Sequence, residues 1–116
     1  MSFKTLYTAI VATLMVGAVQ AFNGDATFYE PNGGTGACGH PIQNTDFAVA
    51  LNPTQYAGGA NCGRTITAHF QGASVTATVQ DLCPGCGNGG IDLTPSAFQR
   101  LASLDRGRIQ VEWDFN

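Results

Sequence analysis

Two aspartates flank a turn rich in glycine and cysteine, "DLCPGCGNGGIDL", at residues 81–93. Asp92 lies between Ile91 and Leu93, an apolar setting in which a carboxyl must be partnered, exposed in a groove or raised in pKa. Asp81 ends a strand, where an aspartate commonly just caps the turn. Two carboxyls brought together by a rigid loop are also the arrangement used in glycoside hydrolysis. The pair is therefore a candidate for acid–base or sugar-binding chemistry.

Four cysteines, Cys38, Cys62, Cys83 and Cys86, permit three disulfide pairings in an exported protein. The simplest joins Cys38 to Cys62 and Cys83 to Cys86. A zinc site made from all four thiolates would normally show two close-spaced pairs, and this sequence has one. A redox centre of the thioredoxin type needs its close pair at the start of a helix, whereas "CPGC" leads into "GNGG". We therefore expect two structural disulfides and neither a metal nor a cofactor, since neither histidine has a ligand partner at metal-binding spacing.

The elements that must position these residues are mostly strands, because apolar residues alternate with polar ones along much of the chain. Gln71 and Gly72 separate two such runs and predict a hairpin. A helix is predicted after Thr94 as N-cap and Pro95 as first helical residue, extending through Leu104. A weaker helical turn is expected at Pro53. The predicted strands span 25–29, 47–51, 64–70, 73–81, 90–93 and 108–115.

The N-terminal segment has the features of a secretory signal peptide. One lysine precedes a short apolar run of small residues that closes with Val19-Gln20-Ala21. The run is shorter than the roughly 20 apolar residues of a membrane span. We expect residues 1–21 to be removed and residues 22–116 to form one secreted, extracellular domain, working as a monomer.

Charge and composition exclude several partners. The chain carries eight acidic residues against five basic ones, a formal charge of −3. Nucleic acids and anionic membrane surfaces both require clustered basic residues, so neither is expected as a partner. Few charges, many glycines and short alternating runs instead fit a small β-barrel with helical crossovers.

Three stretches carry a family resemblance: "GDATFYEPNGGTGACG" at 24–39, "VQDLCPGCGNGGIDLTPSAF" at 79–98 and "GRIQVEWDF" at 107–115. Together they resemble the expansin-like, barwin-like superfamily, nearest the single-domain secreted fungal loosenins. The match covers nearly all of residues 22–116 and keeps the order of the motifs. It implies a mainly β fold, a six-stranded double-psi β-barrel with one or two short helices and two disulfides, and an open polysaccharide groove.

The resemblance also assigns candidate residues. The groove aspartate, related to the proton donor of family 45 endoglucanases, corresponds to Asp92, and the aspartate of the "DLxP" turn corresponds to Asp81. The threonine and aromatic residue of the first strand correspond to Thr27 and Tyr29. These four are the expected polysaccharide-binding residues, with Thr27 orienting Asp92. The family's first disulfide supports pairing Cys38 with Cys62, which leaves Cys83 with Cys86.

Departures from the family pattern limit the chemistry. The related hydrolases carry a catalytic base two positions after the first-strand tyrosine, and that position is Pro31. Glu30 is adjacent, but a shift of one residue along a strand turns a side chain to the opposite face. Cys83 stands where several expansins have a groove tyrosine. No residue is therefore assigned a confirmed catalytic role, and Asp92 is the candidate.

Three functions follow, in order of preference. The first is a non-hydrolytic, cell-wall-loosening protein that binds a polysaccharide of the cellulose or chitin class. The second is a protein-binding barrel, such as a protease inhibitor or effector, that uses the loops "EPNGGTG" and "HPIQNTD". The third is an enzyme, a lytic transglycosylase or weak glycosidase, that relies on Asp92 alone.

Overall fold

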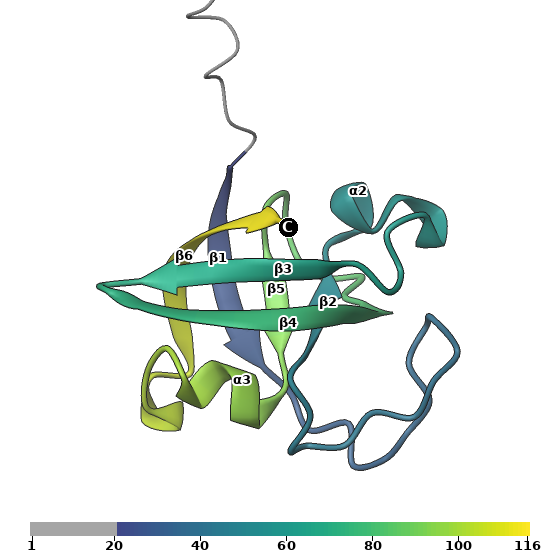
Figure 1. The fold of residues 1–116 in the computed structure, drawn as a ribbon, viewed down its shortest axis with the longest axis horizontal. Helices are drawn as coiled ribbons and strands as arrows, with labels where there is room; N and C mark the ends of the chain where they lie inside the picture. Colours follow the sequence, from purple (N-terminus) through teal and green to yellow (C-terminus); the bar gives the residue numbers. More distant parts are fainter. Residues whose placement is uncertain (1–20) are drawn as a thin grey trace, which may run out of the picture.

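The computed structural model describes residues 21–116, which form a closed six-stranded barrel with strand order β1-β5-β2-β4-β3-β6. The predicted signal peptide lies outside these residues except for Ala21. The strands are β1 (Phe22–Phe28), β2 (Ala48–Leu51), β3 (Thr65–Phe70), β4 (Ala73–Leu82), β5 (Ile91–Leu93) and β6 (Arg108–Phe115). Figure 1 shows β3 and β4 crossing in front of β1, β5 and β6. All six predicted strands are present, and they close into the predicted six-stranded barrel.

Strand pairing brings distant parts of the chain together. The β1–β5 and β2–β4 pairs are parallel, and the other four pairs are antiparallel. The β3–β4 hairpin turns at Gln71 and Gly72, whose φ angles of 47° and 85° give the left-handed turn that suits twisted strands. The short strand β5 lies between β1 and β2, and it therefore places Asp92 beside two other strands.

The barrel interior is filled by the apolar residues of the alternating runs. Inward side chains on β2 and β5 are fully buried, and Trp113 of β6 packs against Phe22 at one end with ring centroids 4.6 Å apart. The Trp113 indole N–H donates a buried 2.8 Å hydrogen bond to the carbonyl of Gly89. The main buried side chains are Val49, Leu51, Ile66, Val79, Ile91, Leu93, Phe98 and Trp113. Since this face is filled, the chemistry must lie on the outer face.

Short helices cover the barrel ends. They are α2 (Pro53–Tyr56) with η1 (Ala57–Gly59), and α3 (Pro95–Gln99) with η2 (Leu104–Arg106), and Figure 1 shows α2 and α3 on opposite sides of the crossing strands. In the described part of the chain, no helix is both long and apolar enough to cross a membrane.

The predicted helix from Pro95 through Leu104 is too long. Its hydrogen bonds tighten at Arg100 and Leu101, which donate to carbonyls three residues back, and the chain becomes extended at Ser103. The Ser103 hydroxyl accepts from the backbone N–H of Asp105 and begins η2 instead. The cap at Ser103 therefore divides residues 95–106 into two short helices, although the spacing of their apolar residues fits one continuous helix.

Thr94 precedes α3 as predicted, but its side chain makes no capping hydrogen bond. The hydroxyl is fully buried and donates to the carbonyl of Asp46 at 2.5 Å, and it lies 3.3 Å from the Ala48 amide nitrogen. Thr94 therefore occupies the predicted N-cap position, but its side chain ties the start of β2 to the end of β5 and does not cap the helix.

Candidate functional site

Asp92 is held on the outer face of the barrel by the short strand β5. Its neighbours Ile91 and Leu93 point inward and are fully buried, so alternation turns the Asp92 carboxyl outward, where it is half-buried. The same alternation directs Thr27 of β1 outward. Because Thr27 and Asp92 are register partners, the Thr27 hydroxyl donates to Asp92 Oδ1 at 2.9 Å.

The pKa of Asp92 is raised above the usual range of a carboxyl. Burial is the main cause, because it disfavours the charged form, and the nearby Asp81 carboxylate acts in the same direction. The Thr27 hydrogen bond and the positive charge of Arg108 oppose the shift. Asp92 therefore retains its proton to a higher pH than an exposed aspartate, so it can donate as well as accept a hydrogen bond.

Asp81 lies two strands away from Asp92, with Ala50 of β2 paired to both. Both Asp81 oxygens are occupied. Oδ2 accepts the Tyr29 hydroxyl at 2.8 Å, while Oδ1 accepts the backbone N–H groups of Ala37 at 2.8 Å and Leu82 at 2.9 Å. A carboxylate offers about four lone-pair positions, so this one is largely saturated by the protein itself.

The segment 30–47 packs on the barrel next to Asp81. Ile42 is 1% exposed and anchors this segment outside the main barrel core. At Gly36 a Cβ atom would lie 2.4 Å from the Gln80 carbonyl oxygen and 2.6 Å from the Ile42 side chain, so only glycine fits there. The segment therefore approaches β4 closely, which brings the Ala37 amide to Asp81.

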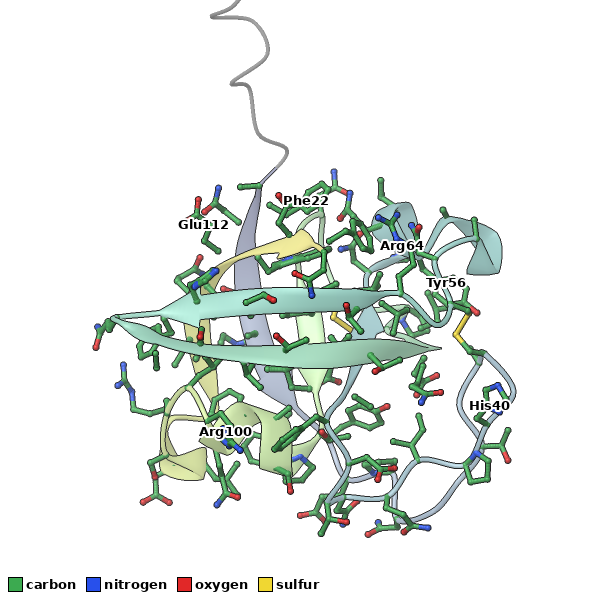
Figure 2. All side chains as sticks on the ribbon, in the orientation of Figure 1. Phe22, His40, Tyr56, Arg64, Arg100 and Glu112 are labelled. Atoms are coloured by element: carbon green, nitrogen blue, oxygen red, sulfur yellow. A yellow bond between two sulfur atoms is a disulfide. The ribbon has the colours of Figure 1, made fainter. Side chains whose placement is uncertain are left out.

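Two disulfides brace this side of the molecule. Cys38 is bonded to Cys62 and Cys83 to Cys86, the pairing implied by the family resemblance. The Tyr56 hydroxyl lies 3.7 Å from Cys62 Sγ, and Figure 2 shows Tyr56 beside that bridge. The first bridge fixes the segment 30–47 to the turn before β3, and the second closes the turn between Asp81 and Asp92.

Tyr29 reaches Asp81 from just beyond the end of β1. Its pKa is raised well above the usual range of a tyrosine, first by burial and then by its hydrogen bond to the Asp81 carboxylate. The phenol stays neutral and holds its donor contact. The predicted site residues thus form two joined pairs, Thr27 with Asp92 and Tyr29 with Asp81.

No carboxyl among the described residues is hydrogen-bonded to Asp92, and Asp81 acts on it only through its charge. Pro31 occupies the position of the family's catalytic base, and Glu30 is an exposed residue in the segment after β1. No hydrogen bond or ion pair of the described residues joins Glu30 to Asp92. Among residues 21–116, no group of three or more metal-ligating side chains is close enough to hold a metal ion.

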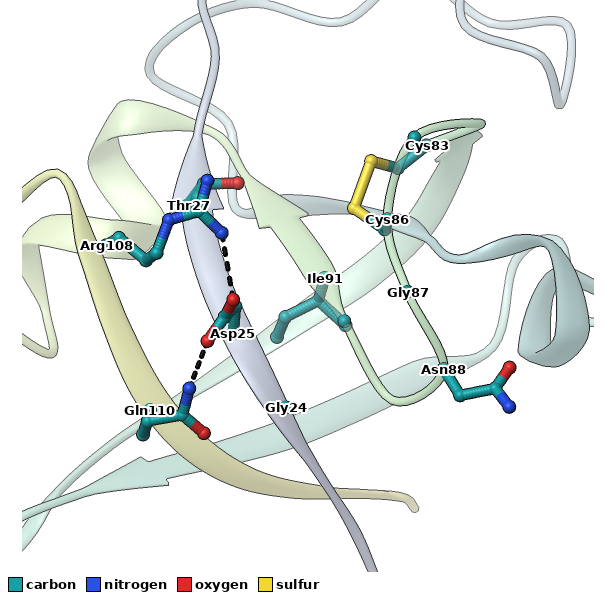
Figure 3. Close-up of a pocket in the computed structure, with 12 residues that line it drawn as sticks. Gly24, Asp25, Thr27, Cys83, Cys86, Gly87, Asn88, Ile91, Arg108 and Gln110 are labelled. Atoms are coloured by element: carbon teal, nitrogen blue, oxygen red, sulfur yellow. Dashed lines mark hydrogen bonds and ion pairs between the residues drawn. A yellow bond between two sulfur atoms is a disulfide. The ribbon is translucent and has the colours of Figure 1, made fainter.

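A cavity of about 460 Å³ lies directly beside Thr27, and we call it the β1–β6 cavity. Figure 3 shows Asp25, Arg108 and Gln110 on one side of it and the Cys83–Cys86 disulfide on the other. Arg108 makes a 2.9 Å ion pair with Asp25, and Gln110 also donates to the Asp25 carboxylate. The segment 83–91 completes the lining.

The sequence did not single out Asp25, Arg108 or Gln110, although it holds a signal for Asp25. Asp25, Thr27 and Tyr29 alternate along one strand and therefore share the outward face of β1. Arg108 and Gln110 alternate in the same way on β6, but their position beside Thr27 and Asp25 depends on strand pairing. Periodicity alone does not give that pairing.

Comparison with known proteins places this chain in a family. The family model described as "Lytic transglycolase" matches residues 21–113. The papain inhibitor of Streptomyces mobaraensis is 33% identical over 104 residues, covering 83% of this chain and 72% of that protein. The Asp f 7 allergen homolog of Arthroderma benhamiae is 39% identical in an alignment of 112 positions, which covers 79% of this chain and 38% of that protein.

A solved structure shows the same fold. A mutant Clavibacter michiganensis expansin, in complex with cellohexaose, superposes with a TM-score of 0.77 at 26% identity, covering 84% of this chain and 50% of the expansin. The chain thus spans about half of that expansin's length and less of the allergen homolog's. It belongs to the lytic transglycolase family, within the expansin-like double-psi β-barrel superfamily.

Proposed function

We propose that this protein is secreted, with residues 1–21 as its signal peptide, and that it binds cell-wall polysaccharide and loosens it without cutting it. Its ligand is a glycan of the cellulose or chitin class, and the expansin relative with bound cellohexaose supports that class. The observation that carries the proposal is Asp92, an outward, half-buried carboxyl whose orientation is fixed by Thr27. It offers a directed polar contact on an accessible face, as a sugar-binding groove requires.

The four predicted binding residues contribute differently. Asp92 hydrogen-bonds a sugar hydroxyl, and Thr27 fixes the carboxyl orientation. Asp81 acts indirectly, because its oxygens are already occupied by Tyr29, Ala37 and Leu82. It holds the Tyr29 ring in place, and that ring offers an apolar surface to the glycan. Contacts of this kind compete with hydrogen bonds between glycan chains and so loosen a network.

Binding without hydrolysis is favoured by the lack of a suitable base. An inverting glycosidase needs two carboxyls roughly 6.5–9.5 Å apart across the bond that it cleaves. Asp81 already accepts three hydrogen bonds from protein donors, and Pro31 stands at the family's base position. A single acid is left, which is sufficient to bind a hydroxyl but gives no water-activating partner.

The test incubates wild-type protein, Asp92→Ala and the control Asp105→Ala with insoluble cellulose, chitin and other wall glycans. Asp105 is an exposed acid in η2, so the control removes the same charge outside the site. We expect the wild type and the control to bind to the insoluble glycan and Asp92→Ala to bind less. None of the three proteins should release soluble sugar from it. Release of reducing or anhydro sugars that disappears in Asp92→Ala would instead identify a single-acid lytic enzyme.

A second candidate function is protease inhibition, and the similarity to the papain inhibitor favours it. In that case the exposed loops within 30–47 would contact the protease, and Asp92 would be dispensable. Titration of papain with the wild type and Asp92→Ala tests this candidate directly. Equal inhibition by both proteins, with no retention on any glycan, would replace the polysaccharide proposal.

A further inference from the structure

The β1–β6 cavity adjoins the Asp92 site through a shared residue. Thr27 lines the cavity and also donates to Asp92. In the strand register Thr27 is paired with Asp92 on one side and with Arg108 on the other. A ligand that contacts Asp92 therefore reaches the cavity by crossing one strand, β1.

The wall formed by β1 and β6 presents both donors and acceptors. Asp25 pairs with Gln110 in the register, and its carboxylate accepts from Gln110 and from Arg108. A guanidinium has five N–H donors, and the ion pair uses one of them in the structure. The Gln110 carbonyl oxygen remains an acceptor. Donor and acceptor groups thus lie close together, as is needed to bind adjacent hydroxyls.

The opposite wall is a rigid loop with little side-chain bulk. Its start is fixed by the Cys83 amide, which donates to the Leu51 carbonyl, and its end by the Trp113 contact to Gly89. Between these points the disulfide and the glycines Gly85 and Gly87 face the cavity. Because the loop is held at both ends, the cavity exists before any ligand binds, which lowers the cost of binding.

The lining favours a neutral, hydroxyl-rich ligand. Arg108 and Asp25 neutralise each other, so an anion entering the cavity would meet the Asp25 carboxylate as well as the guanidinium. Among the described residues that line the cavity, none is aromatic, which disfavours planar ligands that bind by stacking. The volume of about 460 Å³ is within the usual range for small-molecule sites.

We propose that the β1–β6 cavity is a further sugar-binding subsite, which takes the neutral pyranose unit adjacent to the one at Asp92 through hydrogen bonds to Arg108 and Gln110. This inference rests on the proposed polysaccharide binding and extends it past Thr27. The groove then runs from Tyr29 through Asp92 to the disulfide loop, and Arg108 and Gln110 select neutral over uronic-acid-containing glycans.

The test measures calorimetric affinities for cello- and chito-oligosaccharides of increasing length, from the disaccharide to the hexasaccharide. The variants are Gln110→Ala and Arg108→Ala, and Glu112→Ala is the matched control. Glu112 is exposed on the same face of β6 but does not line the cavity, and Figure 2 shows it at the periphery of the barrel. Unchanged denaturation midpoints show that the variants are folded.

We expect the affinity of the wild type to rise with oligosaccharide length. Gln110→Ala and Arg108→Ala should each lower the affinity for the hexasaccharide roughly tenfold, which corresponds to one hydrogen bond. Their affinity for the disaccharide should change little. Hexasaccharide binding should also shift the amide NMR signals of Gly85 and Gly87. If Asp92→Ala loses binding while both cavity variants match the wild type at every length, only the subsite inference is overturned. If the wild type binds no oligosaccharide of either series, the proposed binding function and the subsite are both overturned.

Discussion

At the scale of single residues, Asp92 determines how stability depends on pH. Its pKa is raised by folding, so the folded state holds the proton more tightly than the unfolded state does. The free energy of unfolding therefore falls as the pH rises from the usual carboxyl pKa through the raised one. We expect Asp92→Asn, which carries no charge, to gain stability relative to wild type over that window. Urea unfolding at a series of pH values measures this, and a constant difference would contradict it.

Asp81 connects Tyr29 to the segment 30–47. Asp81→Ala removes the acceptor for both the Tyr29 hydroxyl and the Ala37 amide, and we expect a loss of about 1–3 kcal/mol in the free energy of unfolding. The pKa of Tyr29 should also fall toward its usual range, which an ultraviolet absorbance titration detects. Tyr29→Phe is the matched control, because it removes a single one of these contacts and should cost less. Loss of stability without a change in the Tyr29 titration would show that Asp81 does not hold the phenol.

Individual site residues were predictable to different degrees. Asp92 stood out because a carboxyl between two apolar strand residues has few structural explanations. The saturation of Asp81 was not predictable, since its donors come from residues 29 and 37, and their approach depends on how the segment 30–47 packs. Arg108 was not predictable for a similar reason, because the alternating pattern of β6 gives its face but not its neighbour Thr27.

At the scale of elements, the Thr94 hydroxyl links two strands, although Thr94 stands at the N-cap position of α3. Thr94→Val keeps the shape but removes the hydroxyl, which leaves the Asp46 carbonyl without this donor, and we expect a loss of about 1–3 kcal/mol. Thr94→Ser retains the hydroxyl and should cost less. Thr94→Asn separates the two roles, because asparagine is a better helix cap but is too large for this buried position. Stabilisation by asparagine in chemical denaturation would restore the capping interpretation.

The two disulfides should differ in their contribution to stability. Their sequence separations are 24 and 3 residues, and cross-linking a longer loop restricts the unfolded chain more. From loop entropy we expect removal of Cys38–Cys62 by paired alanine substitutions to cost about 3.5 kcal/mol, and removal of Cys83–Cys86 about 2 kcal/mol. Chemical denaturation of the two double variants measures both values. Equal costs, or the reverse order, would show that native contacts outweigh chain entropy here.

Strand positions were largely predictable because each strand has one buried face and therefore a period of two. The start of the helix at Pro95 was predictable as well, but its length was not, because the apolar residues Phe98 and Leu101 also fit a longer continuous helix. The helix does not continue because the Ser103 side chain makes a local capping contact, which competes with helical hydrogen bonding. The spacing of apolar residues does not reveal such a local contact. The position of β5 between β1 and β2 was not predicted, because periodicity gives the face of a strand and not its neighbours.

At the scale of the whole molecule, barrel closure depends on close contact between β1 and the end of the disulfide loop. A Cβ atom at Gly24 would lie 2.3 Å from the Gly89 carbonyl oxygen, a backbone atom that cannot rotate away. We expect Gly24→Ala to lose about 3 kcal/mol or more. Gly85→Ala is the control, since a Cβ there meets no atom within 4 Å. Thermal unfolding compares the two, and a tolerated Gly24→Ala would mean that the barrel can relax at this contact.

The strand order also determines when this barrel can form. The neighbours of β1 are β5 and β6, and the Asp25–Gln110 contact spans 85 residues. A chain emerging from the ribosome therefore has no partner for β1 until β5 has been made, and the barrel cannot close before β6. Long-range pairing of this kind is slow, because the chain must close a large loop before any contact compensates. Barrel closure is thus delayed until β6 has been made, and the export that we propose would then act on a chain that has not yet folded.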